Sequence, residues 1–232
     1  MPQLQPPALQ PYTTVAREAT DEYVVQKSRF LGHCAPVESE EQALAFLAGM
    51  RQRYKDASHN CYAYVIGLNA GIMRYSDDGE PGGTAGLPMM EVLKKRGVVN
   101  CCVVVTRYFG GVLLGAGGLV RAYTRTAALA LDAARVVTMH PTARFLLDIP
   151  YPLWDKVQHA MKELPARLEA PEFSASVGAE LVVRVADADA VLARLATVTD
   201  GRLEAVEAGQ GYEGWAEAGA ENDGARRGTP PA

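Results

Sequence analysis

The sequence predicts an α+β protein of two domains, and three of its features support this fold class. A β-branched run at residues 103–105 leads through a glycine-rich turn into a helical pattern. After Val136 the pattern of elements starts again, and Pro141 marks the joint. The second half then reads strand, helix, strand, strand, helix, strand, the order of a ferredoxin-like sandwich. A chain of 232 residues has room for two domains of ordinary size.

Composition sets the expected domain limits. Residues 1–13 are rich in proline and are expected to form a poorly ordered arm. The first domain is predicted at residues 14–136 and the second at residues 140–209. Glycine, alanine, glutamate and proline dominate residues 210–232, which are predicted to be a disordered tail.

In the first domain, strands are predicted at residues 15–25 and 29–37. Ser39 and Gln42 have the spacing of a capping box, so a helix is expected to follow them. The remaining predicted elements are strands at residues 60–68 and 72–75, a helix at 88–96, a strand at 101–106 and a helix at 119–135.

In the second domain, residues 143–149 alternate as a strand, and the apolar residues of 153–164 line one side of a helix. Residues 166–177 and 180–185 are predicted to form a hairpin about Gly178, although Pro171 favours a bulge or an edge strand. Asp187 is expected to cap a helix that Gly201 closes, and residues 202–208 form the last predicted strand.

Five glycines crowd nine residues after the central strand of the first domain: Gly110, Gly111, Gly115, Gly117 and Gly118. Glycine weakens a strand or a helix by roughly 0.5–1 kcal/mol, so this density indicates positive φ or a close approach of another surface. The N–H groups of such a turn, with the positive end of the following helix, suit an anion. The alternative is that the glycines only let a helix pack closely on a sheet.

Basic residues surround this turn. Residues 92–131 contain no acid and six cations, namely Lys94, Lys95, Arg96, Arg107, Arg121 and Arg125. Arg121 and Arg125 share a helix face because they stand four residues apart. We therefore expect Arg107, Arg121 and Arg125 to form one continuous basic surface beside the turn. With Tyr108, Lys94, Lys95 and the five glycines, this surface is the predicted nucleic-acid or anion site.

Known nucleotide signatures do not fit the turn. Gly110 and Gly115 have the spacing of a Walker loop, but Ala116 and Gly117 stand where the loop requires lysine and serine or threonine. Val120 occupies the position where a dinucleotide fingerprint has glycine or alanine. The four cysteines have no C-x-x-C spacing and are typical of buried thiols in a reducing cytosol. No cofactor is expected.

Two polar stretches form a second possible site. His59 and Asn60 enter a strand, where His59 is a candidate general base or ligand or, more simply, a hydrogen-bonded structural residue. The following loop contains Asp77, Asp78, Glu80 and Thr84. Its carboxylates are candidate ligands for a divalent ion, but the calcium-loop spacing is missing. We therefore favour a solvated acidic turn, or one that pairs with the basic surface, and predict no metal.

The overall charge argues for local rather than general binding of a polyanion. The chain has a hydrophobic content of 48%, a charged content of 22% and a net charge of −4. Residues 1–136 carry 14 basic and 12 acidic side chains, and the remainder carries 9 and 15. Non-specific coating of nucleic acid is therefore not expected. No signal peptide or membrane-spanning stretch is visible, so a cytoplasmic location without a membrane partner is predicted.

Three long blocks of the sequence resemble the signature of the YigZ/IMPACT family. They are HNCYAY from His59, YSDDGEPGGTAG from Tyr75 and VVTRYFGGVLLGAGGLVRAY from Val104. The resemblance implies a first domain of the type shared by a small-subunit ribosomal protein and the fourth domain of elongation factor G. It implies a second, ferredoxin-like domain similar to the fifth domain of that factor, as in the bacterial YigZ branch.

The resemblance also implies a role in translation. Eukaryotic members restrain the amino-acid-starvation kinase by competing for its activator, and the bacterial branch suggests binding of nucleic acid or the ribosome. Three hypotheses follow. The first is a module that binds RNA or the ribosome, the second an enzyme acting on a phosphate ligand at the glycine turn, and the third a regulator with an acidic protein partner. We favour the first, because no complete catalytic constellation is visible.

Overall fold

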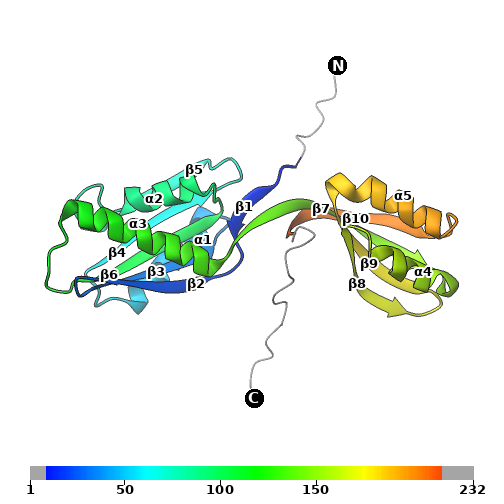
Figure 1. The fold of residues 1–232 in the computed structure, drawn as a ribbon, viewed down its shortest axis with the longest axis horizontal. Coiled ribbons are helices and arrows are strands. Elements are labelled where there is room, and N and C mark those ends of the chain that lie inside the picture. The colour runs from blue at the N-terminus through cyan, green and yellow to red at the C-terminus, as the bar shows by residue number, and fades with distance from the viewer. Residues whose placement is uncertain (1–8, 216–232) are drawn as a thin grey trace, which may run out of the picture. The chain divides into compact units, whose positions relative to one another are not determined.

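The computed structural model describes residues 9–215, which form two compact units (Figure 1). The N-terminal unit is Tyr12–Thr138, and the C-terminal unit comprises the described residues from Met139 onward together with residues 9–11. Most of the predicted arm (residues 1–8) and of the predicted tail (residues 216–232) lies outside the described residues. No helix of the described chain is both long and apolar enough to cross a membrane.

The N-terminal unit is built on an antiparallel sheet of five strands in the order β2-β3-β6-β4-β5. At its centre β6 (Cys101–Tyr108) pairs with β3 (Ser28–Pro36) and β4 (His59–Ile66). The outer strands are β2 (Ala19–Val25) and β5 (Ile72–Ser76). The apolar run of β6 has no polar alternation because both of its faces are buried.

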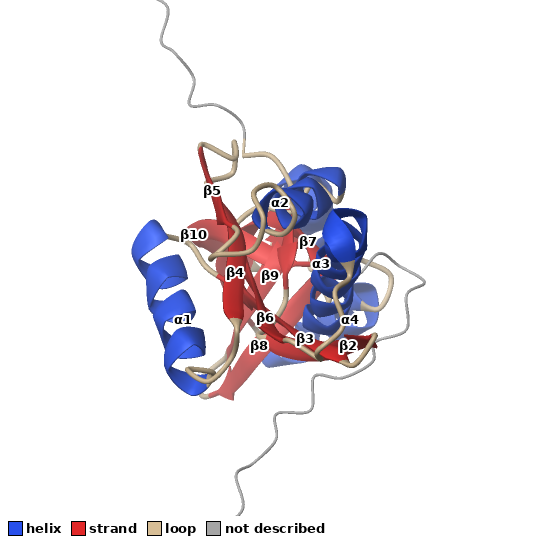
Figure 2. Ribbon diagram, turned by 90° about the vertical axis from the view of Figure 1, so that its left-hand side faces the viewer, coloured by secondary structure: helices blue, strands red, loops and turns tan. Residues whose placement is uncertain are grey.

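Helices cover both faces of this sheet (Figure 2). On one face, α2 (Gly86–Lys95) and α3 (Gly115–Ala134) pack against Val103 and Val105. On the other, α1 (Glu40–Arg53) packs against Cys102 and Val104. Gly32 permits the contact of the sheet with α3, since a Cβ there would lie 2.8 Å from the Thr126 carbonyl oxygen.

The C-terminal unit has the βαββαβ order that the sequence predicts. Its antiparallel sheet has the order β10-β7-β9-β8, and α4 and α5 cover one face over a separate apolar core. The elements are β7 (Val136–Ile149), α4 (Tyr151–Met161), β8 (Ala166–Phe173), β9 (Val177–Arg184), the short 3-10 helix η1 (Val185–Asp187), α5 (Ala188–Val198) and β10 (Glu204–Gly214).

Several predicted boundaries were wrong. A strand, β1 (Tyr12–Val15), begins inside the predicted arm, and Val99 donates its N–H to the Thr13 carbonyl at 2.9 Å. β7 runs through Pro141, which lies one residue outside the ladder with β9 and opposite Tyr212 in the ladder with β10. The β8–β9 turn lies at residues 174–176 rather than at Gly178. Strand β10 continues through residues 210–214 of the predicted tail.

Candidate nucleic-acid interface

The glycine-rich turn between β6 and α3 (residues 109–114) begins with a tight contact on the β2–β3 hairpin. Gly110 donates its backbone N–H to Ser28 Oγ at 3.1 Å. A Cβ built on Gly110 would lie 2.1 Å from the carbonyl carbon of Lys27, so no larger residue fits there. Gly111 and Gly115 have φ values of +81° and +68°. The fold therefore explains three of the five glycines.

The remaining two glycines lie in the first turn of α3, which begins four residues earlier than predicted. Gly118 faces Leu114, whose Cβ would be 2.9 Å from a Cβ built on the glycine. Gly117 has no positive φ, is exposed, and would place a Cβ 3.6 Å from its nearest neighbour, Arg121 Nη1. A helical glycine costs roughly 0.5–1 kcal/mol relative to alanine, and neither backbone nor packing accounts for Gly117.

Arg107 does not lie on the predicted exposed surface. Only 7% of its side chain is exposed, and Nη1 donates to Glu80 Oε1 at 2.6 Å. Its guanidinium also lies over the rings of Phe30 and Phe109, with centroid distances of 5.3 and 5.5 Å. The prediction of one continuous surface of three arginines is therefore wrong for Arg107, because β6 directs this side chain under the loop that carries Glu80.

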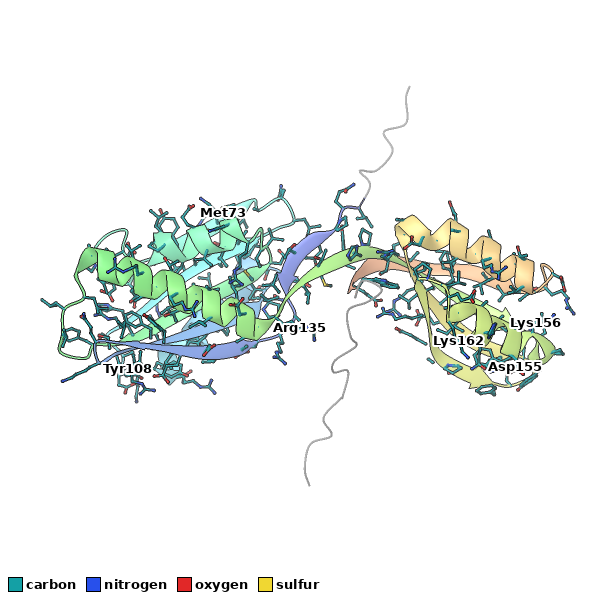
Figure 3. The ribbon with its side chains drawn as sticks, viewed as in Figure 1. Met73, Tyr108, Arg135, Asp155, Lys156 and Lys162 are labelled. Atoms are coloured by element: carbon teal, nitrogen blue, oxygen red, sulfur yellow. The ribbon has the colours of Figure 1, made fainter. Side chains whose placement is uncertain are left out.

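Tyr108 also lies away from α3. Successive side chains of a strand point to opposite faces, so Tyr108 projects on the side opposite to Arg107. Its hydroxyl donates to Asp56 Oδ1 at 3.0 Å. Figure 3 shows Tyr108 at the end of the N-terminal unit where α3 begins and Arg135, which follows α3, at the other end. Tyr108 is therefore separated from the start of α3 by the face of the sheet on which it lies.

Arg121 and Arg125 lie on the exposed side of α3, as their spacing predicts. Within residues 9–215, neither guanidinium has a hydrogen-bonding or ionic partner. The Arg121 guanidinium lies over the first helical turn, beside Gly117. That turn begins at Leu114 without a side-chain cap and without an acidic residue. No side-chain cap and no acidic residue of that turn therefore offsets its N–H groups and the positive end of the helix.

A hollow of about 90 Å³ lies next to Arg121. Both α3 and the β2–β3 hairpin contribute to its walls, which are formed by Tyr23, Val25, Gln26, Leu114, Gly118, Arg121 and Ala122. Ligand pockets for whole small molecules usually measure about 300–1,000 Å³. The hollow therefore suits one oxyanion group rather than a complete nucleotide.

Two of the predicted cations are neutralised by acids just outside the acid-free stretch. Lys94 Nζ lies 3.0 Å from Glu91 Oε1, and Arg96 pairs with Asp132. Lys95 is exposed and has no ionic partner in residues 9–215. The unpaired cations of the α2–α3 face are therefore Lys95 and the two arginines of α3.

Asp77 of the acidic loop caps the N-terminus of α2. Its Oδ1 accepts the N–H groups of Ala85 at 3.0 Å and Gly86 at 2.8 Å. Its Oδ2 accepts the N–H of Gly83, also at 2.8 Å. The start of α2 is therefore occupied by the protein's own carboxylate.

Asp78 joins the same loop to β4. Its Oδ2 accepts the Asn60 N–H at 2.7 Å, and its Oδ1 pairs with Arg51 at 2.9 Å. His59 Nδ1 lies 2.8 Å from the Asp78 carbonyl oxygen, and Asn60 Oδ1 accepts the Thr106 hydroxyl at 2.7 Å. The structure thus brings the predicted polar residues together, with their polar groups used in internal hydrogen bonds.

Glu80 is the buried member of the loop. The Tyr123 hydroxyl donates to its Oε1 at 2.7 Å, on the oxygen that also pairs with Arg107. His59 Nε2 lies 3.9 Å from this oxygen, and the Cys61 thiol lies 3.4 Å from the Tyr123 hydroxyl. Burial raises the pKa of the Cys61 thiol to about 12 and also raises the pKa of Tyr123. Neither group is prepared to act as a nucleophile near neutral pH.

The acidic loop is therefore a scaffold in this structure. Thr84, its last predicted site residue, donates its hydroxyl to the Pro81 carbonyl at 2.7 Å. In residues 9–215, no three histidine, cysteine or acidic side chains are placed to hold a metal ion. Sequence reasoning missed Tyr123, Arg51 and Thr106 as partners of this loop. One available signal was the tyrosine hydroxyl on the inward face of the predicted helix.

Comparison with known proteins identifies both parts of the chain. Residues 26–131 match the Impact N-terminal domain, and residues 147–202 match a domain of unknown function, DUF1949. The chain is 38% identical over 199 residues to the IMPACT family member YvyE of Bacillus subtilis, covering 86% of this chain and 92% of that protein. It is 33% identical to YigZ of Escherichia coli, covering 78% and 89%.

Eukaryotic proteins match only the first part. The mouse protein named IMPACT is 41% identical over 95 residues, which are 39% of this chain and 29% of that protein. A crystal structure described as that of a hypothetical protein is 31% identical, with a TM-score of 0.55, and covers 85% of this chain and 97% of its own.

Proposed function

The chain belongs to the IMPACT family, and from this premise we propose that it is a translation-associated regulatory protein that binds RNA, free or in the ribosome, through the start of α3. One observation carries the proposal: the unpaired guanidinium of Arg121 lies beside Gly117 over an uncapped, acid-free helix N-terminus. Kinship with the eukaryotic IMPACT proteins supports the translational part.

The chemistry of this position fits an RNA phosphate. Helix N–H groups and arginine donate to the same oxyanion, and a glycine on the exposed turn lets a backbone approach closely. Arg125 extends the positive charge one turn further along α3, where a second phosphate of the same strand would lie. The expected likeness of the two units to the fourth and fifth domains of elongation factor G belongs to this proposal and favours a ribosomal setting.

The C-terminal unit carries its arginines differently. Arg144, on the face of the sheet away from α4 and α5, pairs with Glu180 at 3.0 Å and also contacts Glu169 and Glu213. A guanidinium shared among carboxylates has little attraction left for a phosphate. The proposal therefore assigns RNA binding to the N-terminal unit.

The two alternatives receive less support. An enzyme acting on a phosphate ligand would have to use a hollow of about 90 Å³ and groups whose polar atoms are already bonded internally. A regulator with an acidic protein partner would use the same unpaired cations. Salt dependence separates it from RNA binding, because each phosphate contact releases condensed counterions.

The test is binding of a fluorescent hairpin RNA and of purified ribosomal subunits across a salt series. Arg121→Ala should lower affinity about equally for different RNA sequences and reduce the salt slope by about 1. Gly117→Ala should lower affinity while raising the stability of α3 by roughly 0.5–1 kcal/mol, since Gly117 needs no positive φ. Lys156→Ala, on α4 of the C-terminal unit (Figure 3), is the matched control.

Unchanged affinity of Arg121→Ala at low salt would refute the proposal. An equal loss in Lys156→Ala would refute it as well, because binding would then follow total charge rather than this site. Turnover of a nucleotide that Arg121→Ala slows at saturating substrate would replace it with the enzyme hypothesis.

A further inference from the structure

A second surface of the N-terminal unit is the groove between α2 and α3, and the RNA proposal uses none of the residues that line it. The two helices lie side by side in both ribbon views (Figures 1 and 2). The groove has a volume of about 370 Å³ and is lined by Gly83, Leu87, Pro88, Glu91, Val92, Lys95, Val120 and Thr124. Its α2 residues from Leu87 to Lys95 follow that helix for about two turns, roughly 12 Å.

The walls of this groove are aliphatic and open to solvent. Leu87 of α2 is 39% exposed and Val120 of α3 is 36% exposed, although both stand on regular helices that have a core to pack against. Such apolar surface, rimmed by charge, is typical of an interaction site. No aromatic ring lines the groove, so it offers no platform on which an RNA base would stack.

We propose that this groove binds an acidic amphipathic helix of a partner protein. A groove that runs between two helices accepts the side-chain ridge of a third helix, whose residues at i, i+3 or i+4, and i+7 fill the apolar floor. The groove is long enough for two turns of such a helix.

The charge at the rim specifies the acidic character of the partner. Lys95 lines the groove on the α2 side, and on α3 Arg121 and Arg125 each follow a groove-lining residue, Val120 and Thr124, without lining the groove themselves. All three cations lack ionic partners in residues 9–215. Glu91 is the acidic residue among those that line the groove, and Lys94 already neutralises it at 3.0 Å. A helix with glutamate or aspartate beside its apolar face would therefore be attracted on both sides.

The test uses the full chain and a designed, fluorescein-labelled peptide of about 16 residues, with leucines along one helical face and glutamates elsewhere. Fluorescence anisotropy should show binding, and circular dichroism should show that the peptide gains helix. Val120→Gln should weaken peptide binding about tenfold, because it places a polar amide in the centre of the apolar floor. Leu87→Ala should weaken it by about three- to tenfold.

Matched controls isolate the groove. Val24→Gln changes an equally simple side chain, 57% exposed, on β2, and should leave peptide binding unchanged. A scrambled peptide should bind at least about tenfold more weakly, and so should a peptide with lysine in place of every glutamate. Val120→Gln should leave RNA affinity within about twofold, so failure here and failure of the RNA proposal are separate results.

Three outcomes would overturn the inference. Equal binding of the scrambled or lysine peptide would show that neither helix nor charge is recognised. An unaffected Val120→Gln variant would place the peptide elsewhere. Sedimentation velocity of the protein alone is the third readout: a dimer that Val120→Gln dissociates would make a second copy of this chain the occupant of the groove.

Discussion

The N-termini of α2 and α3 lie on the same face of one sheet but are treated in opposite ways. At α2, Asp77 accepts three backbone N–H groups, and the residues around it are tied to β4 and β6. At α3, the described chain supplies no cap and no acid, and Arg121 adds positive charge. The carboxylate cluster at α2 is therefore part of the scaffold, whereas the glycine cluster at α3 leaves a helix N-terminus without a cap.

The two helix N-termini differ in whether the polar groups beside them already have partners within the chain. In the acidic loop, both carboxylate oxygens of Asp77 and of Asp78, and Oε1 of Glu80, have partners within the chain. In the first turn of α3, Gly117 has no positive φ that would require glycine, and the neighbouring Arg121 has no hydrogen-bonding or ionic partner in residues 9–215. The capped N-terminus of α2 and the uncapped N-terminus of α3 are distinguished by which polar groups already have a hydrogen-bonding partner, and not by residue type.

Among the predicted effects, removal of the Glu80 carboxylate should destabilise the N-terminal unit most strongly. Glu80→Ala leaves the Arg107 guanidinium buried and unpaired, so the free energy of unfolding should fall by about 3–5 kcal/mol in urea denaturation. Glu22→Ala is the control, because its ion pair with Arg29 is exposed and should contribute less than about 1 kcal/mol. Similar losses in the two variants would contradict the buried network.

The cap itself is tested by Asp77→Asn, which keeps the side-chain shape but loses the charge and one acceptor. We expect a loss of roughly 2–3 kcal/mol, measured by thermal unfolding, because charge-assisted bonds to the start of α2 are weakened. Asp132→Asn, whose partner Arg96 is at the surface, should change stability by less than about 1 kcal/mol. A stable Asp77→Asn variant would mean that α2 needs no cap.

A pH titration tests whether the loss of stability in acid comes from the loop of Asp77, Asp78 and Glu80 or from His33 on the opposite face of the sheet. Burial, with a contribution from Arg53, lowers the pKa of His33 from 6.5 to about 4. The unfolded chain then binds a proton in a range where folded His33 stays neutral. Stability should therefore fall as the pH drops from about 6.5 toward 4, by about 2 kcal/mol at pH 5.

His33→Gln keeps a polar group opposite Thr20, whose hydroxyl lies 2.9 Å from His33 Nδ1, and removes the titration. Urea unfolding between pH 7 and pH 5 should then lose this part of its slope. If the slope is unchanged, the acid sensitivity arises elsewhere.

A substitution can give the N-terminus of α3 the carboxylate that the N-terminus of α2 already has. Ala116→Asp, at an exposed position in the first turn of α3, should raise the free energy of unfolding by about 0.3–1 kcal/mol. The same change should lower RNA affinity, since the new charge competes for the phosphate position. Ala116→Gln is the neutral control. Stabilisation without loss of RNA binding would place the RNA elsewhere.

The smallest expected effect is that of a chelator. If the loop of Asp77, Asp78 and Glu80 holds no metal, EDTA removes no bound ligand, and the melting temperature should stay the same within error. A fall of several degrees, reversed by adding a divalent ion, would show that the carboxylates have a second role.

Short-range features of the fold followed from the sequence alone. The Ser39 Oγ caps α1 by accepting the Gln42 N–H at 3.2 Å, and the βαββαβ order of the C-terminal unit is the predicted one. The placement of Arg121 and Arg125 on one exposed face of α3 also follows from their four-residue spacing. These features depend on residues within one or two turns of each other or on the period of a single element, which a sequence displays directly.

Only the tertiary structure decided which conspicuous residues remain available to a partner. Arg107 is not available to a partner, because Glu80, 27 residues earlier, lies opposite it once β6 and the loop after β5 are in place. Asp77 is not available to a metal ion or a partner, because its carboxylate accepts the N–H groups at the start of α2. β10 extends into the predicted tail because its residues 210–214 pair with residues 139–143 of β7. Local patterns give a residue its chemistry, but a partner distant in sequence determines whether that chemistry is already satisfied.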